Sequence, residues 1–157
     1  MAVEIERKFL VDKSAWESYP KDKPHYLRQG YLFKDLIKTA RVRVSDETGY
    51  LTIKGKTIGI SRAEYEFEIP REEAEELLTQ FCETVIMKHR FIIPFAEKLW
   101  EVDVFLGDNE GLIVAEIELV DEGETFTLPP FITTEVTGTR KYYNSQLAAN
   151  PYKYWEE

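Results

Sequence analysis

The stretch Val3-Glu4-Ile5-Glu6-Arg7-Lys8-Phe9-Leu10-Val11 decides the fold, because its residues alternate as in a β-strand with two unlike faces. Successive side chains of a strand point to opposite sides of its sheet. The charged face comprises Glu4, Glu6 and Lys8, and the other comprises Ile5, Phe9 and Val11, with Arg7 as the exception. In one isolated strand this alternation indicates only that one face of a sheet meets water.

The same alternation returns along the chain, with charged residues two positions apart. The later pairs and triplets are Arg41/Arg43, Lys54/Lys56, Glu64/Glu66/Glu68, Lys88/Arg90, Glu101/Asp103 and Glu116/Glu118. The strands that we expect span residues 3–11, 25–33, 38–45, 50–56, 60–69, 84–94, 98–106 and 112–120, with a last element around 133–137. Most of the charged strands carry either bases or acids, whereas a merely solvated sheet is free to mix them.

Two architectures are compatible with strands that each have one charged and one apolar face. The first is an open sheet whose charged face lies in water. The second is a closed barrel with the charges in its lumen. Eight or nine strands suit a closed barrel, which also removes exposed sheet edges. We therefore predict an α+β fold, mainly β, built as a closed eight-stranded antiparallel barrel with a charged lumen and helices packed outside.

Three helices are expected around this barrel. Residues 71–82 follow Pro70 and place apolar side chains at helical spacing. Shorter helices are expected over residues 12–19, with Ser14 as a plausible N-cap, and over 144–149. Without a repeat or a linker, the sequence predicts one domain over residues 1–157, with residues 150–157 as a peripheral tail.

The composition is that of a globular protein, with 157 residues, 31% of them charged and 43% hydrophobic. A net charge of -9 argues against nucleic-acid or anionic-membrane partners. No apolar run approaches the roughly 20 residues of a membrane span, and the chain enters a strand almost at once, so we predict a cytoplasmic protein. The lone Cys82 excludes an internal disulfide and a cysteine-rich zinc site.

A lumen that holds many carboxylates together with many Lys and Arg side chains requires pairing or solvation of its charges. Carboxylate oxygens suit a hard divalent cation such as Mg²⁺ or Mn²⁺. Arg and Lys suit phosphate oxygens, and Arg can bind them in bidentate fashion. A linear triphosphate with its metal ion therefore fits the predicted lumen.

The segment Glu4-Ile5-Glu6-Arg7-Lys8 resembles the ExExK signature of the CYTH superfamily, the triphosphate tunnel metalloenzymes. Further matching segments follow in order: Gln29-Gly30-Tyr31-Leu32, Arg41-x-Arg43, Thr52-Ile53-Lys54-Gly55, Glu64-Tyr65-Glu66, Lys88-x-Arg90, residues 100–105, residues 115–119, and Glu135-Val136-Thr137-Gly138 with Arg140-Lys141-Tyr142. ExExK alone is a weak signal, but this ordered set is specific and spans nearly the whole chain. The resemblance implies an eight-stranded tunnel that hydrolyses or rearranges triphosphates with Mg²⁺ or Mn²⁺.

The resemblance also implies roles for individual residues. The implied metal ligands are Glu4, Glu6, Glu116 and Glu118, with Asp103 as a further acidic wall residue. The implied triphosphate cradle is Lys8, Arg41, Arg43, Lys54, Lys88 and Arg90. The implied catalytic residues are Lys8, Glu64, Glu66 and Tyr31. Of these, Glu64 and Glu66, like Asp103, are able to hold a second metal or to orient water, and Tyr31 contacts either the substrate or only the wall.

Three functions remain open at this stage. The leading one is an inorganic triphosphatase acting on tripolyphosphate, with nucleoside or thiamine triphosphates as close alternatives. A class IV adenylyl cyclase would release cyclic AMP from ATP, but no segment indicates an adenine pocket. A non-catalytic polyphosphate-binding module would bind without turnover, although pure anion binding does not need so many carboxylates. The expected partner is a small-molecule triphosphate, and the sequence leaves a homodimer open.

Overall fold

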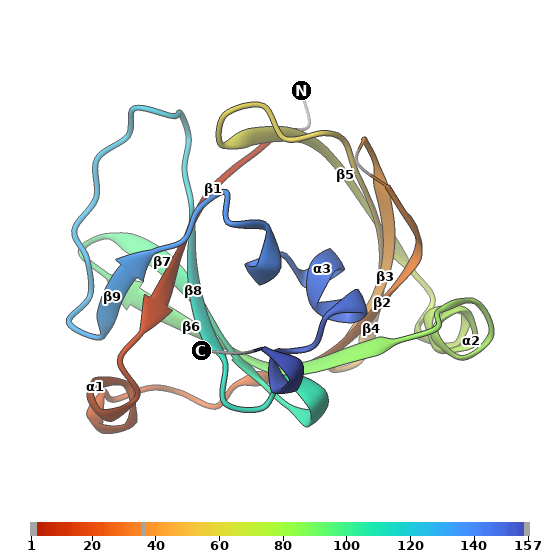
Figure 1. Cartoon of the computed structure of the whole chain (residues 1–157), viewed down its shortest axis with the longest axis horizontal. Coiled ribbons are helices and arrows are strands. Elements are labelled where there is room, and N and C mark those ends of the chain that lie inside the picture. Colours follow the sequence, from red (N-terminus) through yellow and green to blue (C-terminus); the bar gives the residue numbers. More distant parts are fainter. Residues whose placement is uncertain (1–2, 36, 156–157) are drawn as a thin grey trace.

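Antiparallel strands curl into a closed ring in the computed structural model, which describes residues 3–35 and 37–155 (Figure 1). The strands of this part of the chain are β1 (Val3–Val11), β2 (His25–Lys34), β3 (Thr39–Ser45), β4 (Thr48–Lys54), β5 (Ser61–Ile69), β6 (Val85–Phe95), β7 (Lys98–Phe105), β8 (Ile113–Glu118) and β9 (Ile132–Glu135). The helices are α1 (Lys13–Ser18), α2 (Arg71–Phe81) and α3 (Asn144–Ala149), with short 3-10 turns η1 (Gly107–Asn109), η2 (Arg140–Tyr142) and η3 (Tyr152–Tyr154).

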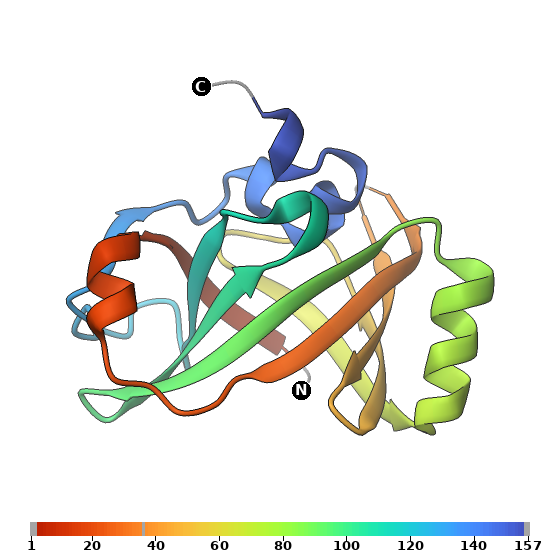
Figure 2. The same cartoon turned by 90° about the horizontal axis from the view of Figure 1, so that it is seen from below.

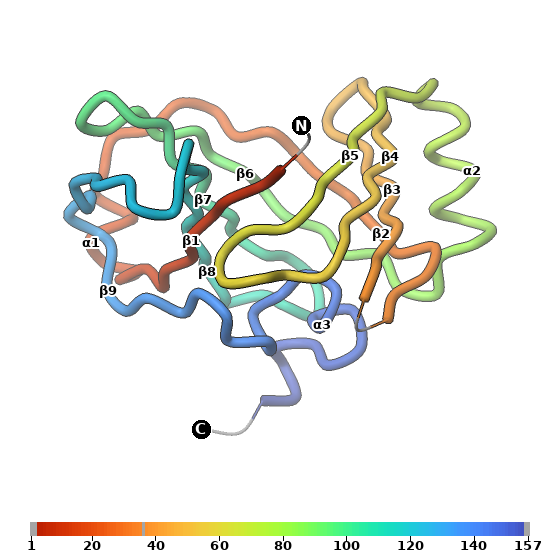
Figure 3. The backbone as a smooth tube through the Cα atoms, turned by 90° about the horizontal axis from the view of Figure 1, so that it is seen from above, coloured from red at the N-terminus to blue at the C-terminus, as the bar shows by residue number. Residues whose placement is uncertain are grey.

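The strand order is β5-β4-β3-β2-β6-β7-β8-β1-β9, and β1 also pairs with β5 to close the barrel. Eight strands form the ring and β9 is an additional strand, so the predicted closed eight-stranded antiparallel barrel is confirmed. Closure depends on one short seam, in which residues 3–5 of β1 face residues 61–63 of β5. Figure 3 shows these two strands running side by side near the start of the chain.

The outward faces of the strands are apolar and are covered by two helices and a long connection. Trp16 of α1, together with Phe126 and Phe131 of the segment before β9, packs against the outer side of β1, β7 and β8. Ala74 and Leu78 of α2 pack on β3 and β4. This burial follows from the sequence, because the side chains between the charged positions of these strands are apolar.

The third helix differs from the expectation of helices packed outside. In Figure 1, α3 lies within the ring of strands, and Figure 2 shows it with the C-terminal segment over one end of the barrel. Leu147 of α3 is completely buried against lumen-facing side chains, among them Ile86, Phe105 and Val114. At this end the lumen is therefore an apolar core, and α3 plugs it.

Smaller differences concern element ends. Asp12, not the predicted Ser14, caps α1, since its Oδ2 accepts a hydrogen bond from the backbone N–H of Ala15 at 2.8 Å. Strand β4 ends at Lys54, so Lys56 lies outside it. No helix in residues 3–35 and 37–155 is long and apolar enough to span a membrane.

Candidate active site

A cavity of about 220 Å³ occupies the lumen next to the plug, whose first residues Asn144 and Ser145 line it. The predicted site residues that line it are Glu4, Glu6, Lys8, Tyr31, Arg41, Arg43, Lys54, Glu64, Glu66, Arg90, Glu116 and Glu118. The two others, Lys88 and Asp103, lie buried behind the cavity wall, with 0% and 1% of their surfaces exposed. The strand period explains the convergence, because residues at i and i+2 of every strand share the inner face.

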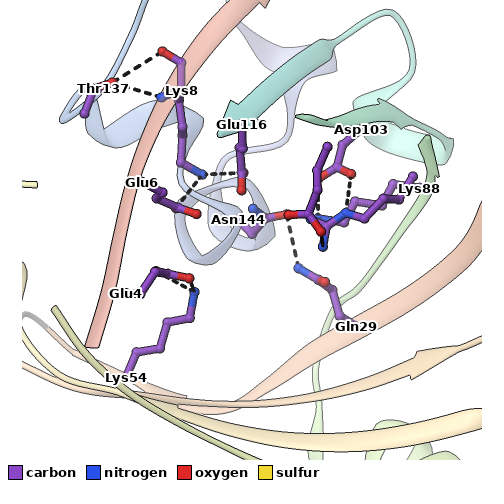
Figure 4. Close-up of polar contacts among 12 residues, drawn as sticks. Glu4, Glu6, Lys8, Gln29, Lys54, Lys88, Asp103, Glu116, Thr137 and Asn144 are labelled. Carbon is purple, nitrogen blue, oxygen red and sulfur yellow. Dashed lines mark hydrogen bonds and ion pairs between the residues drawn. The ribbon is translucent and has the colours of Figure 1, made fainter. Parts of the chain in front are cut away.

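The seam between β1 and β5 contributes an ion-paired cluster. Lys54 Nζ donates to both carboxylate oxygens of Glu4, at 3.1 and 3.0 Å, and Arg62 Nε lies 3.4 Å from Glu4 Oε1 (Figure 4 shows the lysine). Burial disfavours the charge of Glu4, but the positive charges of Lys54 and Arg62 outweigh it and lower the pKa of Glu4 to about 2. The carboxylate of Glu4 is therefore ionised, and Lys54 and Arg62 already compensate for its negative charge.

A second cluster joins β1 to β8. Lys8 Nζ donates to Glu116 Oε1 at 2.9 Å and lies 3.8 Å from Glu6 Oε1. Burial disfavours the charge of Glu116, but Lys8 holds the pKa of Glu116 well below its usual range. Burial and the charge of Glu116 raise the pKa of Glu6 to about 8. The positive charge near Glu6 is thus too small to compensate for the negative charge of its ionised form.

Two more carboxylates on this side of the lumen share that property. Burial and the charge of Glu4 raise the pKa of Glu64, and burial, Glu4 and Glu101 raise the pKa of Glu118. An added cation near these oxygens would relieve the repulsion. Within the described residues, however, no three acidic, histidine or cysteine side chains form a ready-made metal site.

The opposite wall, formed by β3, carries excess positive charge. Arg41 Nη2 and Arg43 Nη2 lie 4.0 and 3.6 Å from Glu66 Oε2, which is too far for strong hydrogen bonds. The Nε atoms of both arginines are buried and have no hydrogen-bond partner among residues 3–35 and 37–155. Burial, together with the charges of Arg41 and Arg90, lowers the pKa of Arg43 to about 10. These guanidinium groups are available for an anion.

Behind the cavity, a hydrogen-bonded group joins β6 to β7. Asp103 accepts from Arg90 Nε at 2.8 Å and Nη2 at 2.9 Å, and from Lys88 Nζ at 2.7 Å. Burial opposes the charge of Asp103, but Arg90 and Lys88 lower its pKa to about 2. Burial lowers the pKa of Lys88 to about 7, with Asp103 opposing the shift. Both oxygens of Asp103 are therefore occupied by cationic side chains.

Several lining residues were missing from the predicted set. Arg62 and Glu101 lie in the same i, i+2 alternation as predicted residues, so the strand period could have assigned both. Tyr143, Asn144 and Thr137 line the cavity from the C-terminal part of the chain, outside the regular strands. No periodic pattern marks these three residues.

The barrel is closed, one wall of its lumen carries arginines without close partners among the described residues, and another carries carboxylates whose negative charge is not fully compensated. Such a tunnel suits an anion with several charges together with a cation. Residues 2–147 match the family model described as CYTH domain, and the chain belongs to this family. The predicted family resemblance is thereby confirmed.

The chain is similar to two curated inorganic triphosphatases. It is 52% identical to that of Acetivibrio thermocellus over 158 residues, covering 100% of both chains. It is 35% identical to that of Nitrosomonas europaea over 152 residues, covering 92% of this chain and 96% of the relative. Among solved structures, the inorganic triphosphatase NE1496 has a TM-score of 0.65 at 32% identity, covering 94% of this chain and 95% of that one.

Proposed function

We propose that this protein is a divalent-metal-dependent triphosphatase that hydrolyses inorganic tripolyphosphate in its lumen. The observation that carries the proposal is the division of the cavity into two complementary walls. Arg41 and Arg43 carry buried Nε atoms without partners, whereas Glu6, Glu64 and Glu118 have raised pKa values. A triphosphate accompanied by a divalent cation satisfies both walls at once. The similarity to two inorganic triphosphatases supports the same conclusion.

The basic residues of the lumen account for substrate binding. Arg41, Arg43 and Arg90 face the cavity and can donate N–H groups to phosphate oxygens. Because their side chains are largely buried, these groups also stabilise the charge that spreads over a transferring phosphoryl group. Lys54 and Lys8 are already paired with carboxylates, so they act both as phosphate ligands and as partners that keep Glu4 and Glu116 ionised.

The free carboxylates account for the metal requirement. Glu6 and Glu118 fit a hard cation best, because their oxygens are not neutralised by lysine or arginine as those of Glu4 and Glu116 are. When bound, Mg²⁺ or Mn²⁺ would neutralise phosphate charge and lower the pKa of a coordinated water. We propose that Asp103 instead holds Arg90 and Lys88 in place, since both of its oxygens accept hydrogen bonds from them.

The attacking water needs an acceptor that is close to the cavity. Glu64 and Glu66 line the cavity beside the basic residues, and the raised pKa of Glu64 suits a group that receives a proton. Tyr31 also lines the cavity, and we propose that its hydroxyl contacts a terminal phosphate or the leaving group.

A phosphate-release panel tests the proposed function. Purified protein is incubated with tripolyphosphate, ATP, GTP or thiamine triphosphate, each with Mg²⁺, Mn²⁺ or EDTA, and cyclic AMP is assayed in the ATP wells. We expect the fastest release from tripolyphosphate, abolished by EDTA. Cyclic AMP from ATP together with no release from tripolyphosphate would replace the proposal with a cyclase. Tight tripolyphosphate binding without turnover under any condition would replace it with a binding module.

A further inference from the structure

Helix α3 sends a polar side chain from the plug into the wall of the active site. Asn144, the first residue of α3, accepts two hydrogen bonds at its Oδ1 atom, from Lys88 Nζ at 3.0 Å and from Gln29 Nε2 at 3.1 Å (Figure 4). Lys88 and Gln29 are both completely buried. The C-terminal segment therefore supplies an acceptor to a lysine that water does not reach.

These contacts continue without a break to the cavity. Lys88 Nζ donates to Asp103 Oδ2 at 2.7 Å, and Asp103 binds the guanidinium of Arg90 through two hydrogen bonds. Arg90 lines the cavity, whereas Lys88 and Asp103 do not. Lys88 is therefore linked to Arg90, and so to the cavity, through Asp103.

The position of α3 is itself fixed from several sides. Leu147 is buried in the apolar end of the lumen. Lys34 Nζ donates to the carbonyl oxygen of Ser145 at 2.6 Å. Beyond the helix, the backbone N–H of Tyr152 donates to Asn109 Oδ1 at 2.8 Å, and Trp155 packs edge-on against Tyr152. Asn144 is thus held at a defined place and cannot simply follow the lysine.

We propose that Asn144 is a positioning residue that sets the orientation of Arg90 through Lys88 and Asp103, so that the C-terminal plug belongs to the catalytic machinery. The effect on catalysis rests on the proposed function, although the hydrogen-bonded chain does not. A buried ammonium that loses an acceptor must find another or shift toward one. Lys88 then pulls on Asp103, and the guanidinium of Arg90 leaves the geometry that phosphate binding requires.

A double-mutant cycle tests this chain of contacts. Asn144→Leu removes the acceptor at similar size, and Arg90→Lys keeps a positive charge but loses the bidentate contact with Asp103. We expect Asn144→Leu to lower kcat/KM for tripolyphosphate about tenfold and to have little further effect in the Arg90→Lys background. If the losses of kcat/KM in the two single variants multiply in the double variant, the two residues act independently and the proposal is overturned. Wild-type kinetics in folded Asn144→Leu would overturn it as well.

Gln146→Leu is the matched control, because Gln146 lies on the same helix and its side chain makes no hydrogen bond within the described residues. We expect it to retain wild-type kcat/KM, and a loss equal to that of Asn144→Leu would assign the effect to the helix as a whole. If Asn144→Leu does not fold, Asn144→Ser takes its place in the cycle, because serine removes the amide group with a smaller perturbation.

A spectroscopic measurement separates this proposal from the proposed function. The Nε–H resonance of Arg90 in a ¹H–¹⁵N spectrum reports its hydrogen bond to Asp103 without any substrate. We expect Asn144→Leu to shift this resonance and Gln146→Leu to leave it in place. An unmoved resonance would overturn the positioning role even if the wild type hydrolyses tripolyphosphate. A shifted resonance in a protein without turnover would instead reject the function alone.

Discussion

Arg41 and Lys8 both carry a positive charge into the lumen, but their surroundings differ. Arg41 has a carboxylate oxygen of Glu66 only at 4.0 Å, whereas Lys8 donates to the buried Glu116 at 2.9 Å. We expect Arg41→Ala to lower turnover about 100-fold or more while the melting temperature stays near that of the wild type. Lys8→Ala should lower both, because an unpaired buried carboxylate costs roughly 3–5 kcal/mol.

Phosphate-release kinetics and thermal unfolding of the same preparations check this contrast. Arg71→Ala is a suitable control, since Arg71 is an exposed residue of α2 that pairs with Glu47, and neither residue lines the cavity. Full turnover in Arg41→Ala would remove this arginine from the cradle. Equal stability of the Lys8 and Arg41 variants would mean that the pairing with Glu116 does not stabilise the barrel.

Glu6 provides the sharpest prediction for the metal. Burial and the charge of Glu116 raise the pKa of Glu6 to about 8, and Lys8 Nζ lies 3.8 Å from its carboxylate. Replacing Glu6 by an uncharged residue therefore leaves the closer pairing of Lys8 with Glu116, at 2.9 Å, in place. We expect Glu6→Gln to fold and to raise the Mg²⁺ or Mn²⁺ concentration for half-maximal activity about tenfold. Glu68→Gln is the control, since Glu68 lies on the same face of β5 as Glu64 but does not line the cavity. Identical metal titrations for wild type and Glu6→Gln would exclude Glu6 as a ligand.

The strand period predicted most of the site because it fixes which side chains face inward. It could not predict how deeply each one is buried. Lys88 and Arg90 share one face of β6, yet only Arg90 reaches the cavity. Lys88 instead donates a hydrogen bond to Asn144 of the plug, which lies 56 residues further along the chain. Contacts of this range leave no mark in a local pattern.

At the scale of elements, the packing of α2 on the barrel depends on a glycine in β4. A Cβ atom at Gly49 would lie 2.7 Å from Ala74 Cβ and 3.0 Å from the carbonyl oxygen of Ile69. The helix would therefore have to move away from the sheet. We expect Gly49→Ala to cost about 1–3 kcal/mol, which lowers the melting temperature by roughly 2–4 °C per kcal/mol.

Gly55→Ala is the matched control for this substitution. A Cβ atom there would meet Ala63 Cβ at 3.6 Å, which is ordinary van der Waals contact. Its melting temperature should stay within a degree or two of the wild type. If Gly49→Ala melts at the same temperature as Gly55→Ala, α2 is not seated as closely as the structure indicates.

The helices show which elements a sequence can place. Helix α2 has 11 residues, enough to reveal one apolar face, and it covers the outer sheet as predicted. Helix α3 has six residues and one fully buried side chain, Leu147, so its pattern indicates a helix but not the surface that receives it. Only the assembled barrel, whose lumen turns apolar at one end, decides that α3 packs inside.

At the scale of the whole molecule, the barrel is held unevenly. Strands β6 and β7 face each other over eight residue pairs, whereas β1 and β5 close the ring over three. The seam is reinforced from inside by Glu4, which pairs with Lys54 and Arg62. These same side chains line the cavity, so the closure of the barrel and the binding of a ligand share their contacts.

Because the seam and the ligand site share these side chains, we expect the barrel to open locally at the β1–β5 seam and a bound ligand to stabilise its closed form. Without ligand, backbone amides of residues 61–63 should exchange with deuterium faster than those of the β6–β7 ladder, because few contacts hold the seam. Tripolyphosphate with Mg²⁺ should slow exchange at residues 61–63 at least tenfold, since a ligand that binds the closed barrel disfavours opening. Hydrogen exchange with fragment-level mass spectrometry measures both effects. Arg41→Ala, which weakens binding without touching the seam, should leave the free-state pattern unchanged and reduce the protection by ligand. If the seam is as protected as β6–β7 before ligand is added, its short register is not the weak point of the barrel.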